Sequence, residues 1–210
     1  MFDNKILNFK NKKVIVFDLD GTIVKLIADW HSLKNVLNDR YSKYFQKDHQ
    51  FKRISAFLDE IVEKGDEAEL KRNFEIIKQY EIENIEKNEP IEETIYFINN
   101  KELFGVKSGT VLAILSLNTR QTIKKSLDLA NISHKFDFIL GREDLRRWKP
   151  DPEGLLIIME KYKVKKEEMI YFGDLESDLE TGTNAGIEFH FIDDLISLVK
   201  SCKKDKKDLK

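Results

Sequence analysis

The sequence predicts an α/β fold in which helices cover both faces of a parallel sheet and a helical subdomain is inserted. Three observations lead to this fold class. Short apolar runs rich in β-branched and aromatic residues recur along the chain, as expected for buried strands. Segments with helical spacing alternate with the later runs, which favours a parallel sheet. A long stretch after the first run has helical spacing only.

Five apolar runs are expected to form the strands of the sheet. They cover residues 13–18, 110–116, 136–141, 169–174 and 187–192. Helices are expected between the later runs. In the segment 119–132, Ile123 and Leu127 share one face. The segment 151–164 begins with acidic residues and a proline, which suit a helix N-terminus. Ligands of such sheets bind at the carboxyl ends of the strands.

A stretch after the first predicted strand interrupts the alternation of strands and helices. In one of its helical segments, Ile54, Phe57 and Ile61 lie on one face. We interpret the stretch as a helical cap that lies over the strand ends. The predicted boundaries are 1–24 and 91–200 for the discontinuous core, 25–90 for the cap and 201–210 for a charged, disordered tail.

The composition excludes several classes of function. The chain has 210 residues and a net charge of -2, from 36 basic and 38 acidic residues. This balance predicts no overall attraction to nucleic acid or to an acidic membrane surface. A single cysteine, Cys202, excludes an internal disulfide and fits a reducing compartment. No segment is apolar enough to span a bilayer and no signal peptide is recognised, so we expect a cytoplasmic protein.

The stretch VIVFDLDGTIV, residues 14–24, places two carboxylates at the end of the first predicted strand. Asp18 and Asp20 are two positions apart, so on an extended chain their side chains point the same way. Other polar residues follow later predicted strands, and these are Ser116, Lys149, Asp174 and Asp178. A parallel sheet would gather them in one crevice. Four carboxylates there predict Mg²⁺, and the lysine and hydroxyl beside them suit a phosphoryl group.

Four motifs in this order resemble those of the haloacid dehalogenase-like superfamily. They are DLDGT at 18–22, the strand-terminal Ser116, KPDP at 149–152 and GDLESD at 173–178. Within the superfamily they look like the phosphoglycolate phosphatase-like branch. The resemblance implies a Rossmann-like three-layer α/β/α core with a helical cap. It also implies a Mg²⁺-dependent phosphatase that hydrolyses a small phosphorylated metabolite through a phospho-aspartate.

The resemblance further implies a role for each catalytic residue. Asp18 is expected to be the nucleophile, and Asp20 the acid toward the leaving group and then the base that activates water. Ser116 is expected to hydrogen-bond the phosphoryl oxygens, and Lys149 to balance the charge of nucleophile and phosphate. The expected metal ligands are Asp18, Asp20 through its backbone carbonyl, Asp174, and Asp178 through water or by orienting the others.

Three further residues are expected near the substrate. Thr22 follows Gly21 in the sharp turn after the first strand and is expected to help fix that turn. Asn118 stands one place later than in the family pattern, in which the asparagine directly follows the serine or threonine. Arg142 follows the apolar run 136–141 and therefore lies near a strand end.

The cap is expected to select the leaving group and to exclude bulk water. Its first candidate residues for this role are the cations Lys34, Arg40 and Arg53. Hinges are expected near residues 24–27 and 89–92.

One alternative function stays open, and two are disfavoured. A sugar phosphomutase of the same superfamily would share all four motifs and the helical cap. Haloacid dehalogenases lack the acid at the second position of the first motif, so Asp20 argues against that reaction. A purely binding protein would bury these carboxylates at a cost in stability with no gain. We expect a small phosphorylated substrate, with neither nucleic acid nor a membrane as partner; the oligomeric state is not indicated.

Overall fold

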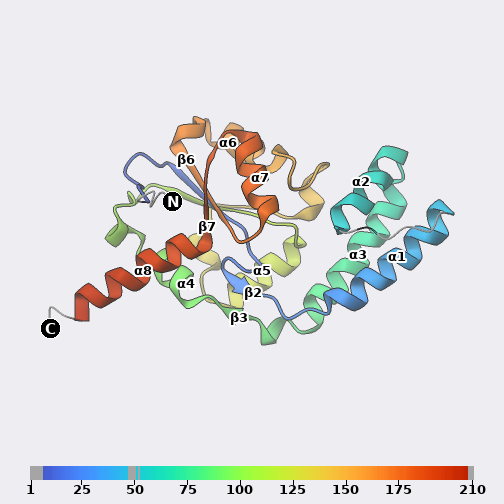
Figure 1. Cartoon of the computed structure of the whole chain (residues 1–210), viewed down its shortest axis with the longest axis horizontal. Coiled ribbons are helices and arrows are strands. Elements are labelled where there is room, and N and C mark those ends of the chain that lie inside the picture. The colour runs from blue at the N-terminus through green and yellow to red at the C-terminus, as the bar shows by residue number, and fades with distance from the viewer. Residues whose placement is uncertain (1–6, 47–50, 52, 208–210) are drawn as a thin grey trace, which may run out of the picture.

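The computed structural model describes residues 7–46, 51 and 53–207, and it contains a parallel sheet of five strands (Figure 1). The strands are β1 (Val14–Phe17), β4 (Val111–Leu115), β5 (Phe138–Leu140), β6 (Met169–Gly173) and β7 (Glu188–Phe191). They lie in the order β5-β4-β1-β6-β7, and all neighbouring pairs are parallel. Each strand falls within one of the five predicted runs, so the predicted α/β fold is confirmed.

The central strand β1 is completely buried on both faces of the sheet. Val14 and Val16 pack into the apolar layer on one face, and Ile15 and Phe17 pack into the layer on the other. A strand covered on both sides needs apolar residues at every position rather than at alternate ones. This explains the unbroken run VIVF.

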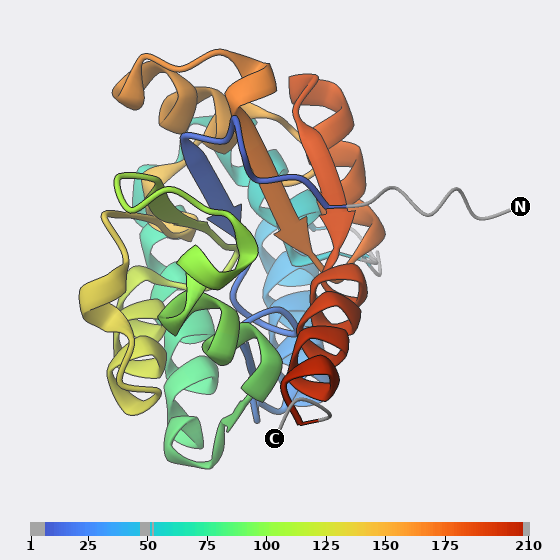
Figure 2. The same ribbon diagram turned by 90° about the vertical axis from the view of Figure 1, so that its left-hand side faces the viewer.

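Helices cover both faces of the sheet, which gives the core three layers (Figure 2). The first face is covered by α6 (Glu153–Tyr162) and α7 (Glu176–Ala185), and the second by α4 (Glu92–Asn99), α5 (Arg120–Leu129) and α8 (Ile192–Lys207). Ile123 and Leu127 of α5 are fully buried against the sheet, as their spacing predicted.

Helix α8 differs from what we expected for the end of the chain. It continues to Lys207, through most of the segment predicted to be a disordered tail. Residues 201–207 contain neither glycine nor proline, and lysine is a good helix former, so their charge does not end the helix. Leu195 and Val199 hold the earlier turns of the helix on the core. Residues 208–210 lie outside the described residues.

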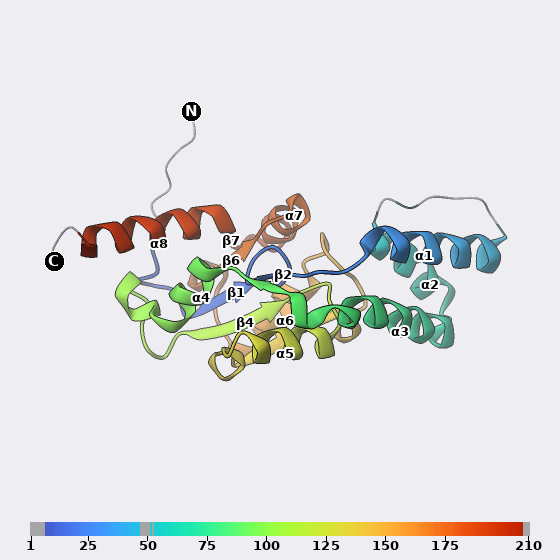
Figure 3. The same ribbon diagram turned by 90° about the horizontal axis from the view of Figure 1, so that it is seen from below.

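A helical insertion lies at one end of the molecule (Figure 3). It consists of α1 (Trp30–Phe45), α2 (Ile54–Lys64), α3 (Glu67–Glu83) and the 3₁₀ helix η1 (Ile85–Lys87). The chain enters it through β2 (Val24–Lys25) and leaves it through β3 (Glu89–Pro90), which pair antiparallel. Val24 is opposite Pro90, so the two crossings between core and insertion lie side by side.

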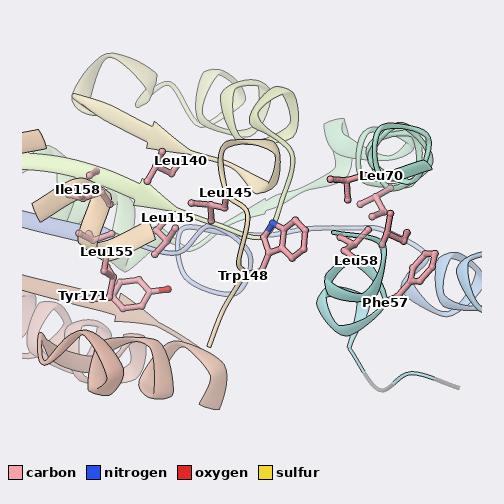
Figure 4. Packing of buried hydrophobic residues seen from close by; sticks show 14 of the residues in the cluster. Phe57, Leu58, Leu70, Leu115, Leu140, Leu145, Trp148, Leu155, Ile158 and Tyr171 are labelled. Carbon is pink, nitrogen blue, oxygen red and sulfur yellow. The ribbon is translucent and has the colours of Figure 1, made fainter. Parts of the chain in front are cut away.

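The insertion has its own apolar interior, which meets the core at Trp148 (Figure 4). Phe57, Leu58 and Leu70 form part of this interior and are almost completely buried. Trp148 lies between this group and the apolar residues of the core. Its ring is 6.1 Å from that of Phe74 on α3, in an edge-to-face arrangement. The insertion is therefore packed against the loop that carries Lys149.

The remaining connections contain short 3₁₀ helices. These are η2 (Lys101–Phe104), η3 (Ser133–Lys135), η4 (Arg142–Asp144) and η5 (Lys166–Glu168). Among the described residues, no helix is both long and apolar enough to cross a membrane.

Candidate active site

The chain turns sharply after β1, and this turn needs a glycine. Asp18 is the first residue after the strand, and its backbone N–H donates to the carbonyl of Phe172 on β6 at 2.9 Å. Gly21 then adopts a φ of +75°. A Cβ at this position would lie 2.2 Å from Oδ2 of Asp174. Glycine therefore satisfies both the backbone conformation and the close approach of a second carboxylate.

Three strands deliver polar residues to the same edge of the sheet. Asp18, Ser116 and Asp174 directly follow β1, β4 and β6. The last residue of β1 is level with residues at the ends of β4 and β6 in the ladder. The carboxyl ends of the strands therefore bring these side chains together, as expected for a ligand site in a parallel sheet.

A cavity of about 720 Å³ opens at this edge and is lined by both the core and the insertion. All the predicted site residues except Thr22 line it, namely Asp18, Asp20, Ser116, Asn118, Arg142, Lys149, Asp174 and Asp178. Thr22 is instead fully buried, and its backbone N–H donates to the carbonyl of Leu19 within the turn. The structure thus places Thr22 in the turn, where its side chain is kept away from the cavity.

Lys149 binds two of the carboxylates that line the cavity. Its Nζ donates to Oδ1 of Asp18 at 2.8 Å and to Oδ1 of Asp178 at 2.6 Å. Asp178 also accepts from the hydroxyl of Tyr171 at 2.5 Å and from the backbone N–H of Leu175 at 3.1 Å. Asp178 is therefore held from several sides and fixes the ammonium group beside Asp18.

The crowding of carboxylates changes their pKa values. Burial and the neighbouring charges of Asp18 and Asp178 raise the pKa of Asp174 to about 7. Burial raises the pKa of Asp20 to about 6. Burial also acts against the charged form of Asp178, but Lys149 beside it holds its pKa below the usual value. One lysine does not balance four carboxylates, so the site favours the binding of an additional cation.

Three of these carboxylates fit a magnesium ion. Asp18, Asp174 and Asp178 each offer an oxygen, and these oxygens lie within 4.8 Å of one another. Oδ1 of Asp174 is buried and has no hydrogen-bond partner among the described residues. An unpartnered buried carboxylate oxygen is costly unless it meets a cation or donor. Oxygen ligands supplied by few protein groups are typical of Mg²⁺ sites.

Ser116 and Asn118 form a second polar group in the cavity. The Ser116 hydroxyl donates to Oδ1 of Asn118 at 2.9 Å, and the backbone N–H of Asn118 donates back to Oγ of Ser116 at 3.3 Å. Both side chains are buried and line the cavity. The later position of Asn118 in the motif therefore does not separate it from Ser116.

The backbone of Arg142 is fixed by two hydrogen bonds, whereas most of its guanidinium nitrogens lack a hydrogen-bond partner among the described residues. Its N–H donates to the carbonyl of Asn118, and its carbonyl accepts from the indole of Trp148, both at 2.9 Å. The guanidinium is buried, with Nη2 lying 3.9 Å from a carboxylate oxygen of Glu81. Among the described residues, its Nε and Nη1 have no hydrogen-bond partner. The site thus contains a buried cation with unused donors.

The predicted cations of the insertion lie in two different places. Lys34 and Arg53 line the cavity, and Lys25 of β2 joins them there. Arg40 points elsewhere and binds Glu69 and Asn73 of α3. It connects α1 to α3 inside the insertion, because its long side chain lies along the helix–helix contact rather than toward the core.

Two polar residues of the site escape the sequence analysis. Tyr171 lies within the apolar strand β6, where its hydroxyl gives no periodic signal. Glu81 lies on α3 among many charged residues. Its one signal is that it follows the buried Ile77 by four positions, which places it on the apolar face of the helix.

Comparison with known proteins agrees with this geometry. Residues 15–192 match the family model of the haloacid dehalogenase-like hydrolases. The pyrophosphatase PpaX of Bacillus mycoides (strain KBAB4) is 28% identical over 179 residues, which span 82% of this chain and 79% of that protein. A phosphoglycolate phosphatase of Aquifex aeolicus (strain VF5) is 28% identical over 177 residues, which span 83% of this chain and 81% of that protein.

A solved structure has the same fold. It is the crystal structure of a HAD-superfamily hydrolase, subfamily IA, variant 1, from Geobacter sulfurreducens PCA. The TM-score is 0.53 at 17% identity, with 87% of each chain covered. At this identity the likeness concerns the fold alone. Neither relative named above is a mutase, so the sugar phosphomutase alternative gains no support from them.

Proposed function

Because this chain belongs to the haloacid dehalogenase-like hydrolase family, we propose that it is a Mg²⁺-dependent phosphatase acting on a small phosphorylated metabolite through a phospho-aspartate. The observation that carries this proposal is the position of Asp18. Its carboxylate lies at the end of the central strand, is bound by Lys149 and lines the cavity together with Asp20 and Ser116.

The reaction follows from the four catalytic residues. Asp18 attacks phosphorus and forms an acyl phosphate as the bond to the leaving-group oxygen breaks. Asp20 gives a proton to that oxygen and later takes one from the attacking water. The water displaces the Asp18 carboxylate and releases inorganic phosphate. Ser116 donates a hydrogen bond to the phosphoryl oxygens, and Lys149 balances the charge of the nucleophile and the phosphate.

Asp18, Asp174 and the backbone carbonyl of Asp20 are the proposed ligands of Mg²⁺. Asp178 is proposed to reach the metal through water and also to fix Lys149, since both of its carboxylate oxygens already have protein partners. When bound, Mg²⁺ neutralises negative charge on the nucleophile and on the phosphoryl group.

Arg142 and the cations of the insertion are proposed to bind the leaving group. Two nitrogens of the buried Arg142 guanidinium have no partner among the described residues, so an anionic or carbonyl oxygen of the substrate would satisfy them. Lys34 and Arg53 line the same cavity from the insertion, which acts as a cap in this proposal. The relatives named pyrophosphatase and phosphoglycolate phosphatase favour a small substrate.

A panel of phosphorylated metabolites tests the proposed function. Phosphate release is measured with Mg²⁺ and with EDTA, and the Asp18→Asn variant serves as the control. Release that needs both Mg²⁺ and Asp18 supports the proposal. Conversion of a sugar phosphate into its isomer without release of phosphate would favour the phosphomutase instead.

A further inference from the structure

One buried carboxylate of the insertion, that of Glu81, lies beside the cavity and binds Asn118, which lines it. It lies in the last full turn of α3, and its side chain is 0% exposed. The preceding residue on the same face, Ile77, is also 0% exposed. A carboxylate in such a place costs stability unless donors surround it. The donors around Glu81 therefore indicate what it does.

Both carboxylate oxygens of Glu81 bind the segment that follows β4. Oε2 accepts from the backbone N–H of Thr119 at 2.9 Å and from the hydroxyls of Thr119 and Thr122 at 2.8 Å each. Oε1 accepts from Nδ2 of Asn118 at 3.2 Å and lies 3.9 Å from Nη2 of Arg142. Thr119 is the N-cap residue of α5 but makes no capping bond with its own side chain. Glu81 supplies negative charge and acceptors at that helix end instead.

Asn118 extends this contact to Ser116. The side-chain oxygen of Asn118 accepts from the Ser116 hydroxyl, while its side-chain nitrogen donates to Glu81. The amide group is thus oriented from both ends, and it holds the Ser116 oxygen in place; the single proton of that hydroxyl turns from Asn118 to a phosphoryl oxygen when phosphate binds. Two hydrogen bonds separate a carboxylate of the insertion from the group proposed to bind phosphate.

We propose that Glu81 is a positioning residue that couples the insertion to the phosphate-binding segment 116–122. It fixes Asn118 and the start of α5, and through them the Ser116 hydroxyl. By linkage, phosphate bound at Ser116 and the docking of α3 on the core stabilise each other. This inference rests on the proposed phosphatase function for the role of Ser116.

The position of Glu81 along the chain links this coupling to cap movement. Glu81 precedes the expected hinge at 89–92, so it belongs to the part that would rotate. Rotation about that hinge withdraws its carboxylate from Asn118 and Thr119. Opening the cap then loosens the phosphate-binding segment, and closing the cap assembles it.

Glu69 provides a matched control on the same helix. It is a second buried glutamate of α3, and it binds Arg40 and Asn73, which both lie in the insertion. Neutralising either glutamate removes one buried charge and several hydrogen bonds. Only Glu81, however, makes these contacts with the segment 116–122. A general loss of stability would therefore affect the variants of both glutamates. A loss of order in the segment 116–122 would affect the Glu81 variant alone.

The main test compares Glu81→Gln with Glu69→Gln in the full chain. Binding of inorganic phosphate with Mg²⁺ is measured by calorimetry, and kcat and KM are measured with a simple aryl phosphate. Glu81→Gln is expected to weaken phosphate binding about tenfold and to lower kcat/KM by at least as much, since charged hydrogen bonds orient the segment. Glu69→Gln is expected to change both by less than about twofold. Amide exchange in residues 116–123 should increase only in Glu81→Gln.

Two further variants keep the test decisive if Glu81→Gln does not fold. Thr122→Val removes one donor to Glu81 and should weaken phosphate binding about threefold. Thr122→Val should weaken phosphate binding less in an Asn118→Ala background than in the wild type. Asn118 and Thr122 both bind Glu81, so their effects on phosphate binding are not independent. The coupling would be overturned if Glu81→Gln and Glu69→Gln weakened phosphate binding equally. It would also be overturned if the losses from Asn118→Ala and Thr122→Val were strictly additive. Phosphate binding that depends on Glu81 without any substrate turnover would instead overturn the proposed function alone.

Discussion

The two sides of the cavity present their charges in different ways. On the core side, Asp18, Lys149 and Asp178 are almost completely buried, and Lys149 binds both carboxylates. On the insertion side, Lys34 and Arg53 are exposed at the cavity wall. Long, exposed side chains can adapt to a ligand, whereas buried and mutually bonded ones cannot. The difference supports the proposal that the sheet carries the chemistry and that the insertion recognises the substrate.

This division has a structural origin. The core residues follow strand ends whose relative positions are set by the parallel ladder. The insertion is joined by a ribbon of two residues per strand, and its contacts with the core include Phe74 against Trp148 and Glu81 against Thr119. Substitutions on the two sides should therefore differ in what they change, and four predictions test this.

The largest effect is expected for the nucleophile. Asp18→Asn should keep the fold but lower turnover by at least about a thousandfold, because an amide cannot form the phospho-enzyme. Circular dichroism checks the fold, and phosphate release checks the rate. Asp128→Asn, an exposed position on α5, is the control and should behave like the wild type. A near-normal rate in Asp18→Asn would contradict the mechanism.

The second largest loss of activity is expected on removal of the metal. Excess EDTA should lower phosphate release by at least about a hundredfold, and Mg²⁺ but not Ca²⁺ should restore it, since Ca²⁺ takes more ligands at longer distances. Mg²⁺ should also raise the melting temperature of the wild type, because it binds the folded state. Asp174→Ala should show a smaller rise. Full activity in EDTA would count against the metal site.

The cations of the insertion should change selectivity rather than chemistry. Lys34→Ala and Arg53→Ala are expected to lower kcat/KM for the preferred metabolite about tenfold, because a charged contact with the leaving group is lost. The same variants should change kcat/KM for an aryl phosphate by less than about threefold. If only core substitutions altered selectivity, the division between the two sides would be wrong.

Arg40 should have the smallest effect on activity. Arg40→Met removes the nearer of the two cations beside the buried Glu69, the other being Arg72, and should lower the free energy of unfolding by about 1–3 kcal/mol. Turnover by the folded protein should stay within about twofold of the wild type, since Arg40 is not among the residues that line the cavity. Urea unfolding and steady-state kinetics measure the two quantities. A change of substrate selectivity in Arg40→Met would contradict the prediction that Arg40, unlike Lys34 and Arg53, has no part in substrate recognition.

The sequence predicts the core side of this comparison well. Apolar runs reveal the strands, and a parallel sheet brings the residues after them together, so Asp18, Ser116 and Asp174 are found without knowledge of side-chain direction. Thr22 shows the limit of this reasoning. It is only two positions beyond Asp20, but the turn directs its side chain into the protein.

The insertion is less predictable for a physical reason. Its helices are recognisable, but a helix surface rich in charge does not show which charged residue meets the core. Residue type alone suggests Arg40 as a cavity residue, but its side chain binds α3; Glu81 looks like one more surface charge of a charged helix, but its side chain is buried. The docking of the helices decides both cases, and that depends on contacts far apart in the sequence.

The ribbon formed by β2 and β3 makes the insertion an exchangeable unit. Val24 and Pro90 are partners across the ribbon, so the two points at which the insertion joins the core are roughly 5 Å apart. Another segment whose ends are equally close can replace residues 26–88 without extending either strand. If the insertion recognises the substrate as proposed, substrate range can be transferred between relatives as a block, provided that the new segment also supplies a carboxylate to the start of α5.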